Sequence, residues 1–306
     1  MIRSFMPFDV VDLLVAGRAL SNKAKTRDGV GRKDARFSDL ANIVGDWFNP
    51  RLRPCVWVYT DGLALKGLAS VRDRRSPHAW EINRLLVADQ DRDCCLELLE
   101  HVGSAGGRLE IGRIYLRLPS DSPLLKAAQE TGFLPYSTEH VYLREGVGGA
   151  GTKSGFPQAL LPRRKKADDE YRLYGLYHTC VPPHVRRAEG MTYKEWQSNR
   201  DRSPGQEWVF EKGGDLVAWV ATDVGRDCGQ LDILAATRDE MQSAVEYGLN
   251  SLSGCQQVCC LVPDFDGALL RLLEDRGFSR MMTYSVLTKE LLVRVVEPLA
   301  MPAVPA

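Results

Sequence analysis

Histidine and cysteine are the residue types in this chain that most readily serve as bases, nucleophiles or metal ligands. There are five histidines and eight cysteines. The cysteines include the adjacent pairs Cys94-Cys95 and Cys259-Cys260, whereas zinc sites space their ligands as C-x-x-C. His78, His101 and His140 could each act as a base, but a lone histidine is more often a surface or satisfied core residue. We therefore predict no metal site, and interpret the cysteines as small buried hydrophobic residues.

A basic run, Arg163-Arg164-Lys165-Lys166, could bind phosphate or an acidic partner. It is followed at once by Asp168-Asp169-Glu170, which favours a solvated helix start neutralised by its own neighbours. The whole chain has 40 basic and 40 acidic residues, so no overall field attracts nucleic acid. We expect no nucleic-acid partner.

Three tyrosines, Tyr171, Tyr174 and Tyr177, recur beside two leucines at helical spacing. They could line the pocket of an acceptor substrate. The alternative, which we favour, is that they form the buried face of a helix packed on a sheet.

The N-terminal apolar stretch is interrupted by Asp9 and Asp12, which is not typical of a signal peptide. No run approaches the ~20 apolar residues of a membrane span. We therefore expect a cytoplasmic protein without a membrane partner. The sequence leaves open whether it is a monomer or a dimer.

A length of 306 residues favours two domains. Residues 146–158 hold five glycines and almost no large apolar side chain, so they form the best linker. The predicted organisation is a first domain over 1–145, a linker over 146–166, a second domain over 167–292 and a tail over 293–306.

The first domain is predicted from hydrophobic periodicity and turn residues. Residues 21–36 are polar and predict a mobile loop. The predicted strands are 2–5, 55–60, 66–72, 80–87, 114–118 and 138–144, and the predicted helices are 7–20, 38–47, 93–104 and 123–131.

The second domain repeats this order. Its predicted helices are 170–177, 193–199, 238–253 and 267–275, and its predicted strands are 207–212, 216–223, 230–235, 257–262 and 283–288. The two halves end alike, in a strand, a proline, an amphipathic helix with two leucines, and Gly132-Phe133 or Gly277-Phe278. The glycine would cap the helix. A repeat of ~145 residues indicates duplicated domains, because solenoid repeats are far shorter.

This order of elements, together with the opening I-R-x-F-x-P-x-D, resembles the GNAT acyltransferase superfamily. The resemblance implies an α+β fold, in which each domain is a mainly antiparallel mixed sheet flanked by helices. It also implies a cofactor, acetyl-CoA or CoA, held where the fourth strand of a domain diverges from the fifth. There a loop written Q/R-x-x-G-x-G/A offers backbone N–H groups at a helix N-terminus to the pyrophosphate.

In the first domain the resemblance places the cofactor beside the strand end Leu86-Val87 and the loop that follows it. Gln90 takes the Q/R position, and Asp93 and Cys95 take the glycine positions, with Arg92 and Cys94 between them. Asp93 and its acidic neighbours would repel a pyrophosphate, and an N-cap aspartate would occupy the donors that it needs. The motif is thus degenerate.

The second domain has Met241 and Ser243 at the glycine positions, so its loop is degenerate too. Family enzymes often place a tyrosine acid four residues before the Gly-Phe, to protonate the leaving thiolate. Here those positions hold Ala128 and Leu273.

A carboxylate on the fourth strand often serves the family as a base. The resemblance assigns that place to Glu81, with Asp232 comparable in the second domain. The alternative for Glu81 is an ordinary strand carboxylate paired with Arg84 or another neighbour.

Two functions follow. One is acetyl-CoA-dependent acyl transfer to an amine of a small molecule or peptide, with Glu81 as the base and the first domain as the cofactor site. The other is a catalytically inactive GNAT-fold scaffold that binds another ligand or a protein partner. A related alternative is a purely structural duplication in which the second copy covers a sheet edge of the first. An open gap between strands 80–87 and 114–118 would favour the enzyme, and a closed pair would favour the scaffold.

Overall fold

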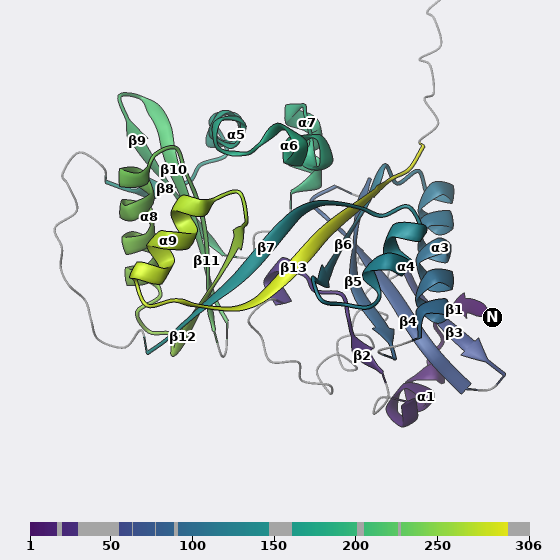
Figure 1. Cartoon of the computed structure of the whole chain (residues 1–306). Helices are drawn as coiled ribbons and strands as arrows, with labels where there is room; N and C mark the ends of the chain where they lie inside the picture. The colour runs from purple at the N-terminus through teal and green to yellow at the C-terminus, as the bar shows by residue number, and fades with distance from the viewer. Residues whose placement is uncertain are drawn as a thin grey trace, which may run out of the picture.

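The structure is a computed structural model that describes residues 1–16, 20–29, 55–62, 64–76, 78–88, 91–146, 161–200, 205–225 and 228–292. In these residues the strands form one continuous sheet that runs through two lobes (Figure 1). In the first lobe the strands lie in the order β1, β3, β4, β5, β6. Their bounds are β1 Ile2–Ser4, β3 Cys55–Asp61, β4 Ala64–Asp73, β5 Ala79–Val87 and β6 Arg113–Pro119.

The second lobe continues the sheet in the order β12, β11, β10, β9, β8. All neighbours in both lobes are antiparallel except the β5–β6 and β11–β12 pairs, which are parallel. The bounds are β8 Arg163–Arg164, β9 Gln206–Lys212, β10 Asp215–Val224, β11 Gly229–Ala235 and β12 Gln257–Pro263.

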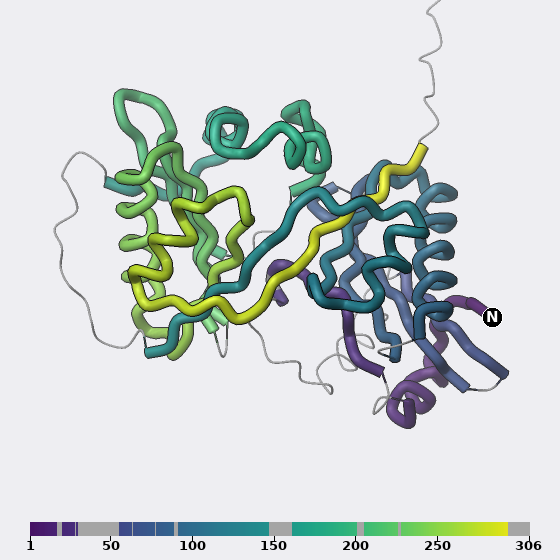
Figure 2. The backbone as a smooth tube through the Cα atoms, viewed as in Figure 1, coloured from purple at the N-terminus to yellow at the C-terminus, as the bar shows by residue number. Residues whose placement is uncertain are grey.

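The two lobes are joined by a pair of long strands, β7 (Leu134–Glu145) and β13 (Ser279–Glu290), which cross the molecule side by side (Figure 2). The strand from each half pairs with the other half. β13 lies against β6 of the first lobe, and β7 lies against β12 of the second lobe. Each half therefore completes its sheet with a strand that the other half supplies.

In the first lobe, side chains alternate between two faces of the sheet, as strand geometry requires. Along β3, Val56 and Val58 face α1 (Asp9–Ala16), and Trp57 lies on the other face with α3 (Arg92–Arg108) and α4 (Leu125–Glu130). Helices thus cover both faces of the first lobe.

The second lobe repeats this layering. Ala218 and Val220 of β10 pack with α8 (Arg238–Ser251) and α9 (Gly267–Asp275), and Trp219 packs on the opposite face. That opposite face is covered by α5 (Asp169–Cys180), α6 (Pro183–Glu189) and α7 (Tyr193–Asn199).

The end of α6 and of α7 also contacts the first lobe. The hydroxyl of Tyr115 donates to the carbonyl of Ala188 at 2.8 Å, and Arg74 donates to the carbonyl of Asn199 at 2.6 Å. These contacts fix the α6–α7 layer over the junction of the two lobes.

The start of each half is built in the same way. Arg3 binds both carboxylate oxygens of Asp9 at 2.7 and 2.5 Å, and Arg163 binds both of Asp169 at 2.7 Å. In each half one oxygen of the aspartate also accepts the backbone N–H three residues before it. The same clamp thus fixes the first strand to the first helix twice.

The predicted α+β architecture and its repeated order of elements are confirmed. The basic run is neutralised by its neighbours as predicted, since Arg163 pairs with Asp169 and Lys165 pairs with Glu170. It is not a solvated helix start, however, because Arg163–Arg164 form the strand β8 and the side chain of Lys165 is largely buried. Among the described residues no helix is long and apolar enough to cross a membrane. The predicted helix over 38–47 lies outside the described residues, and the domain boundaries stay a prediction.

One prediction about the first half was wrong. Of the mobile loop predicted over 21–36, residues 30–36 lie outside the described residues, and residues 21–29 are held against the first lobe. Ser21–Asn22 form the short strand β2, which pairs with β5, and Arg27–Gly29 form a 3-10 turn. The polar side chains of this segment gave no indication of a strand, because its contacts with the sheet are made by the backbone.

Candidate functional site

In the first lobe a gap opens between β5 and β6. These parallel strands pair only from Ala79 to Glu81 on β5 and from Arg113 to Tyr115 on β6. Beyond Glu81 they diverge, as the resemblance led us to expect. A divergence of this kind exposes backbone donors and acceptors on both strands, and something must satisfy them.

Residues 20–29, which we call the strap, fill this gap. The backbone N–H of Lys23 donates to the carbonyl of Leu85 on β5 at 2.9 Å, and that of Lys25 donates to the carbonyl of Arg117 on β6 at 3.0 Å. The side chain of Asn22 accepts the N–H of Leu85 at 2.9 Å. Ala24, between the two lysines, is fully buried in the core under α3. The two strands do not pair with each other here, and the strap occupies the space between them.

The predicted cofactor loop lies at the start of α3. Leu86 and Val87 are buried and pair with Asn22 and Ser21 of the strap. Asp91 is the N-cap of α3, and its side chain accepts the N–H of Cys94 at 3.1 Å. One of the donors that a pyrophosphate would need is therefore already used. Gln90 lies outside the described residues.

The other four loop residues divide between the surface and the core. Arg92 is exposed and pairs with Glu130, and the side chain of Asp93 is 87% exposed. Cys94 and Cys95 point into the core, where burial raises the pKa of each thiol to about 12. Neither thiol faces a cofactor position.

Glu81 is 2% exposed and lies among arginines. Its carboxylate is 2.7 Å from Arg72, 3.5 Å from Arg117 and 4.0 Å from Arg74. This matches the alternative of a paired strand carboxylate, with Arg72, Arg74 and Arg117 as the partners.

The corresponding gap in the second half opens on a cavity. β11 and β12 pair only from Gly229 to Leu231 on β11 and from Val258 to Cys260 on β12. Beyond these pairs the strands diverge on a cavity of about 180 Å³, which lies between the second lobe and the first. This is several times the space that one water needs, so the cavity has room for a small molecule.

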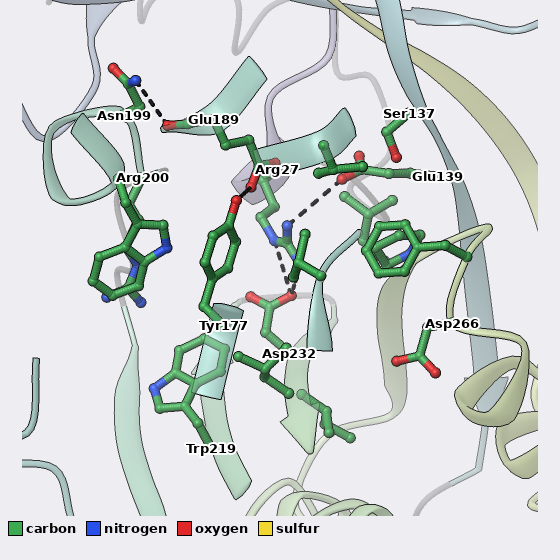
Figure 3. Close-up of a pocket in the computed structure, with 18 of the residues that line it drawn as sticks. Arg27, Ser137, Glu139, Tyr177, Glu189, Asn199, Arg200, Trp219, Asp232 and Asp266 are labelled. Atoms are coloured by element: carbon green, nitrogen blue, oxygen red, sulfur yellow. Dashed lines mark hydrogen bonds and ion pairs between the residues drawn. The ribbon is translucent and has the colours of Figure 1, made fainter. Parts of the chain in front are cut away.

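The cavity wall comes from both lobes (Figure 3). The strap and β7 contribute Arg27, Ser137 and Glu139, and the α5–α7 layer closes the opposite side. The second lobe contributes Asp232 from β11 and residues from the end of β12 to the start of α9. Aromatic rings in the wall are Tyr177, Trp196, Trp219 and Phe265, and charged groups are Arg27, Arg74, Arg200, Glu139, Glu189, Asp232 and Asp266.

Charges of alternating sign connect the cavity to Glu81. The guanidinium of Arg27 lies 2.9 Å from Asp232 and 3.8 Å from Glu139. Glu139 in turn is 2.7 Å from Arg117, which is 3.5 Å from Glu81. Glu81 on β5 and Asp232 on β11, the two carboxylates compared from the sequence, thus stand at the two ends of one ion-pair network.

Two further carboxylates face the cavity. Glu189 accepts hydrogen bonds from the hydroxyls of Tyr177 at 3.0 Å and Tyr136 at 3.4 Å. Burial raises the pKa of both tyrosines. Asp266 is the N-cap of α9 and accepts the N–H of Leu269 at 3.1 Å, and burial raises the pKa of its carboxyl.

Arg200 forms the cationic end of the cavity. Its guanidinium lies 4.8 Å from the ring centre of Trp196 and 5.6 Å from that of Trp219, and it pairs with Glu170 at 3.2 Å. Burial lowers its pKa. Stacking on aromatic rings holds the planar group in one orientation.

The second lobe has no glycine loop at the start of α8. Glu240 is buried there, bonds to the hydroxyl of the N-cap Thr237, and pairs with Lys212 at 3.4 Å. Ala128 and Leu273, where the resemblance expects a tyrosine, are fully buried apolar residues.

Sequence reasoning singled out Asp232 but missed Arg27, Glu139 and Glu189. Arg27 belongs to a segment predicted as a loop, and Glu139 belongs to a strand of mixed polarity. No spacing in the sequence connects residues that lie 205 positions apart. Tyr177 lines the cavity, whereas Tyr171 of the same helix is 69% exposed, so the three tyrosines do not form one buried face.

The fold and the paired strand gaps are those of a tandem GNAT fold. No protein-family model and no curated protein matches the chain. Solved structures share the fold over nearly its whole length. A GCN5-related N-acetyltransferase from Sphaerobacter thermophilus is 14% identical, with a TM-score of 0.54, and the match covers 95% of both chains.

Two other structures agree. A putative acetyltransferase from Pyrococcus horikoshii is 12% identical, with a TM-score of 0.55 over 96% of this chain and 90% of that one. A tandem GNAT protein from the clavulanic acid biosynthesis pathway is 12% identical, with a TM-score of 0.54 over 95% of this chain and 98% of that one. The chain therefore has a tandem GNAT fold, and the likeness at this identity concerns the fold alone.

Proposed function

We propose that this protein binds a small polar ligand in the cavity at the open strand gap of its second half, and that its first half holds no acyl-CoA. The observation that carries the proposal is the contrast between the two gaps. The strap fills the first with backbone hydrogen bonds to both strands, and the second opens on a cavity.

The contents of the first gap support the absence of acyl-CoA there. A pantetheine arm would have to displace Lys23 and Lys25 from Leu85 and Arg117, and each of these hydrogen bonds contributes about 1 kcal/mol. It would also have to expel the buried Ala24 from the core. A pyrophosphate would then meet the carboxylate of Asp91 on the donors that it needs.

We propose a structural role for Glu81. Its carboxylate is held by three arginines and is nearly inaccessible to solvent, so it neutralises a buried cationic cluster. A general base needs contact with the proton that it removes, and Glu81 does not line the cavity.

A second candidate function is acyl transfer in the second half, which the divergence of β11 from β12 specifically favours. An amine in the cavity would attack the thioester carbon of acetyl-CoA, so that a C–N bond forms and the C–S bond breaks. Asp232 would take the proton of the amine, and solvent would protonate the thiolate, since Leu273 cannot donate.

Thermal unfolding with millimolar acetyl-CoA or CoA separates these functions. A ligand at a hundred times its dissociation constant stabilises by about 2.7 kcal/mol. We expect no stabilisation. Stabilisation that Leu261→Trp removes, by filling the cavity wall at β12, would establish the second candidate instead. Stabilisation that survives Leu261→Trp would point to the first half and would overturn the proposal.

Ligand binding in the cavity is tested with four probes of similar size: ethylguanidinium, butylammonium, butyrate and pentanol. Calorimetry of the wild type should detect at least one of them at an affinity on the order of millimolar. Ser137→Trp, which places an indole in the cavity, should abolish that binding. Leu134→Trp, at an exposed position of the same strand, should leave it unchanged. Failure of all four probes with both the wild type and Arg27→Ala would contradict ligand binding in this cavity.

A further inference from the structure

The strap connects the two gaps directly. Its residues Lys23 and Lys25 are hydrogen-bonded between β5 and β6 in the first half, and Arg27, only two residues further along, extends into the cavity of the second half. The side-chain amide of Gln230 on β11 also donates to the carbonyl of Arg27 at 3.1 Å. One short segment therefore occupies the first gap with its backbone and enters the second with a side chain.

The guanidinium of Arg27 contacts two carboxylates through several of its nitrogen atoms. Its Nε and Nη2 both donate to Oδ1 of Asp232, at 3.1 and 2.9 Å, and Nη1 faces Oε1 of Glu139 at 3.8 Å. A planar group with a fixed fork of donors matches two carboxylates in this way, whereas an ammonium presents a point charge. The side chain of Arg27 is 28% exposed, so solvent reaches the site.

The rest of the cavity also favours a cation. Four carboxylates line it, from Glu139, Glu189, Asp232 and Asp266, and they face three arginines. Arg74 lies by Glu81 and over the ring of Tyr115, and Arg200 is held by Glu170 and two tryptophans. If Arg27 withdrew, Asp232 would lose the cation that it binds, and the carboxylates would outnumber the arginines by two to one.

We propose that the cavity binds a guanidinium-bearing small molecule, which replaces Arg27 on Asp232 and Glu139, and that this exchange loosens the strap from the first half. The inference rests on the proposed function, because it names the ligand class of the same cavity. The side chain of Arg27 then competes with the ligand for the same carboxylates. Ligand binding in the second lobe thereby weakens the contacts of the strap with the first lobe.

Calorimetry with the same four probes tests the ligand class. Arg27→Ala should bind ethylguanidinium about tenfold more tightly than the wild type, since the competitor is gone. Lys23→Ala, a matched change in the same strap that keeps the backbone N–H, should bind like the wild type. Adding Asp232→Asn to Arg27→Ala should reverse the gain, since it removes one of the two carboxylate charges.

The relative affinities of the four probes distinguish this inference from the proposed function. Binding of butyrate or pentanol without ethylguanidinium would overturn the ligand class and leave the cavity as a binding site. Tighter binding of butylammonium than of ethylguanidinium would overturn it as well, because the fork of donors would then play no part.

Hydrogen exchange in the wild type tests the link to the first half without any substitution. Saturating ethylguanidinium should speed exchange of the Lys23 and Lys25 amides severalfold, since the strap loses its contact in the cavity. The amide of Phe5, which donates to Val56 on the far edge of the first lobe, is the internal control and should not change. Binding with unchanged exchange at Lys23 and Lys25 would overturn the coupling.

Discussion

The backbone N–H of Lys23 donates to the carbonyl of Leu85, in the gap where the GNAT resemblance predicted a cofactor. The chain thus satisfies with its own backbone the strand edge that a bound pantetheine would otherwise use. A segment that fills a gap in this way becomes part of the core, and it should contribute to stability like any added strand.

Lys23→Pro removes that N–H and should lower the free energy of unfolding by about 2 kcal/mol, because the carbonyl of Leu85 loses its partner. Lys23→Ala keeps the N–H and is the matched control. Chemical denaturation measures both. Equal stability of the two variants would show that the strap is not held by this bond.

Glu81→Gln should destabilise the protein by about 3–5 kcal/mol, because the buried Arg74 and Arg117 and the half-buried Arg72 would lose their shared carboxylate. Glu290→Gln, which breaks a pair with Arg113 at a side chain that is 65% exposed, should cost less than 1 kcal/mol. Urea unfolding compares the two. A small effect at Glu81 would restore the idea that its charge serves chemistry instead of stability.

The Arg163–Asp169 clamp makes stability depend on pH. Hydrogen bonding by Arg163 lowers the pKa of Asp169 to about 2 from a usual value near 4. A lowered acid pKa stabilises the folded state above the unfolded pKa, and this contribution disappears as the pH falls through the folded pKa. Asp169→Asn should therefore cost about 2 kcal/mol at pH 7.

The stability difference between wild type and Asp169→Asn should shrink between about pH 4 and pH 2. Unfolding curves at several pH values would reveal it. Asp168→Asn is the control, because the side chain of Asp168, next to Asp169, makes no capping hydrogen bond. A constant difference down to pH 2 would contradict the assigned pKa.

Neither half should fold alone, because β13 stands between β6 and β7 and β7 stands between β13 and β12. Residues 1–146 produced alone should give no cooperative unfolding transition, since β6 and β7 lose the strand between them. Co-production with residues 161–292 should restore it. Cooperative melting of residues 1–146 alone would mean that β7 can take the place of β13.

The sequence predicted the elements that depend on side-chain patterns. The apolar period of the helices, the two leucines before Gly132-Phe133 and Gly277-Phe278, and the order of strands were enough for the fold. The N-cap at Asp91 also follows from local residue type, since an aspartate before a helix accepts its first N–H groups.

The remaining features depend on contacts that no local pattern encodes. The strap enters the sheet through its backbone, so its polar side chains predict a loop. Arg27 and Asp232 lie in different lobes, which the exchanged strands β7 and β13 hold together. The clamp at the start of each half is an exception, because a local pattern encodes it. The spacing of six residues between Arg3 and Asp9 occurs again between Arg163 and Asp169.

The exchange of β7 and β13 also constrains how such a protein can change. Deleting either half would leave the survivor without the strand that completes its sheet, so the doubled chain cannot shrink back to one unit by a single loss. A substitution in β7 or β13 should likewise affect both lobes, because the two strands pair with each other and each also pairs with a strand of one lobe. Two similar halves are thus joined into one sheet by the strands that they exchange.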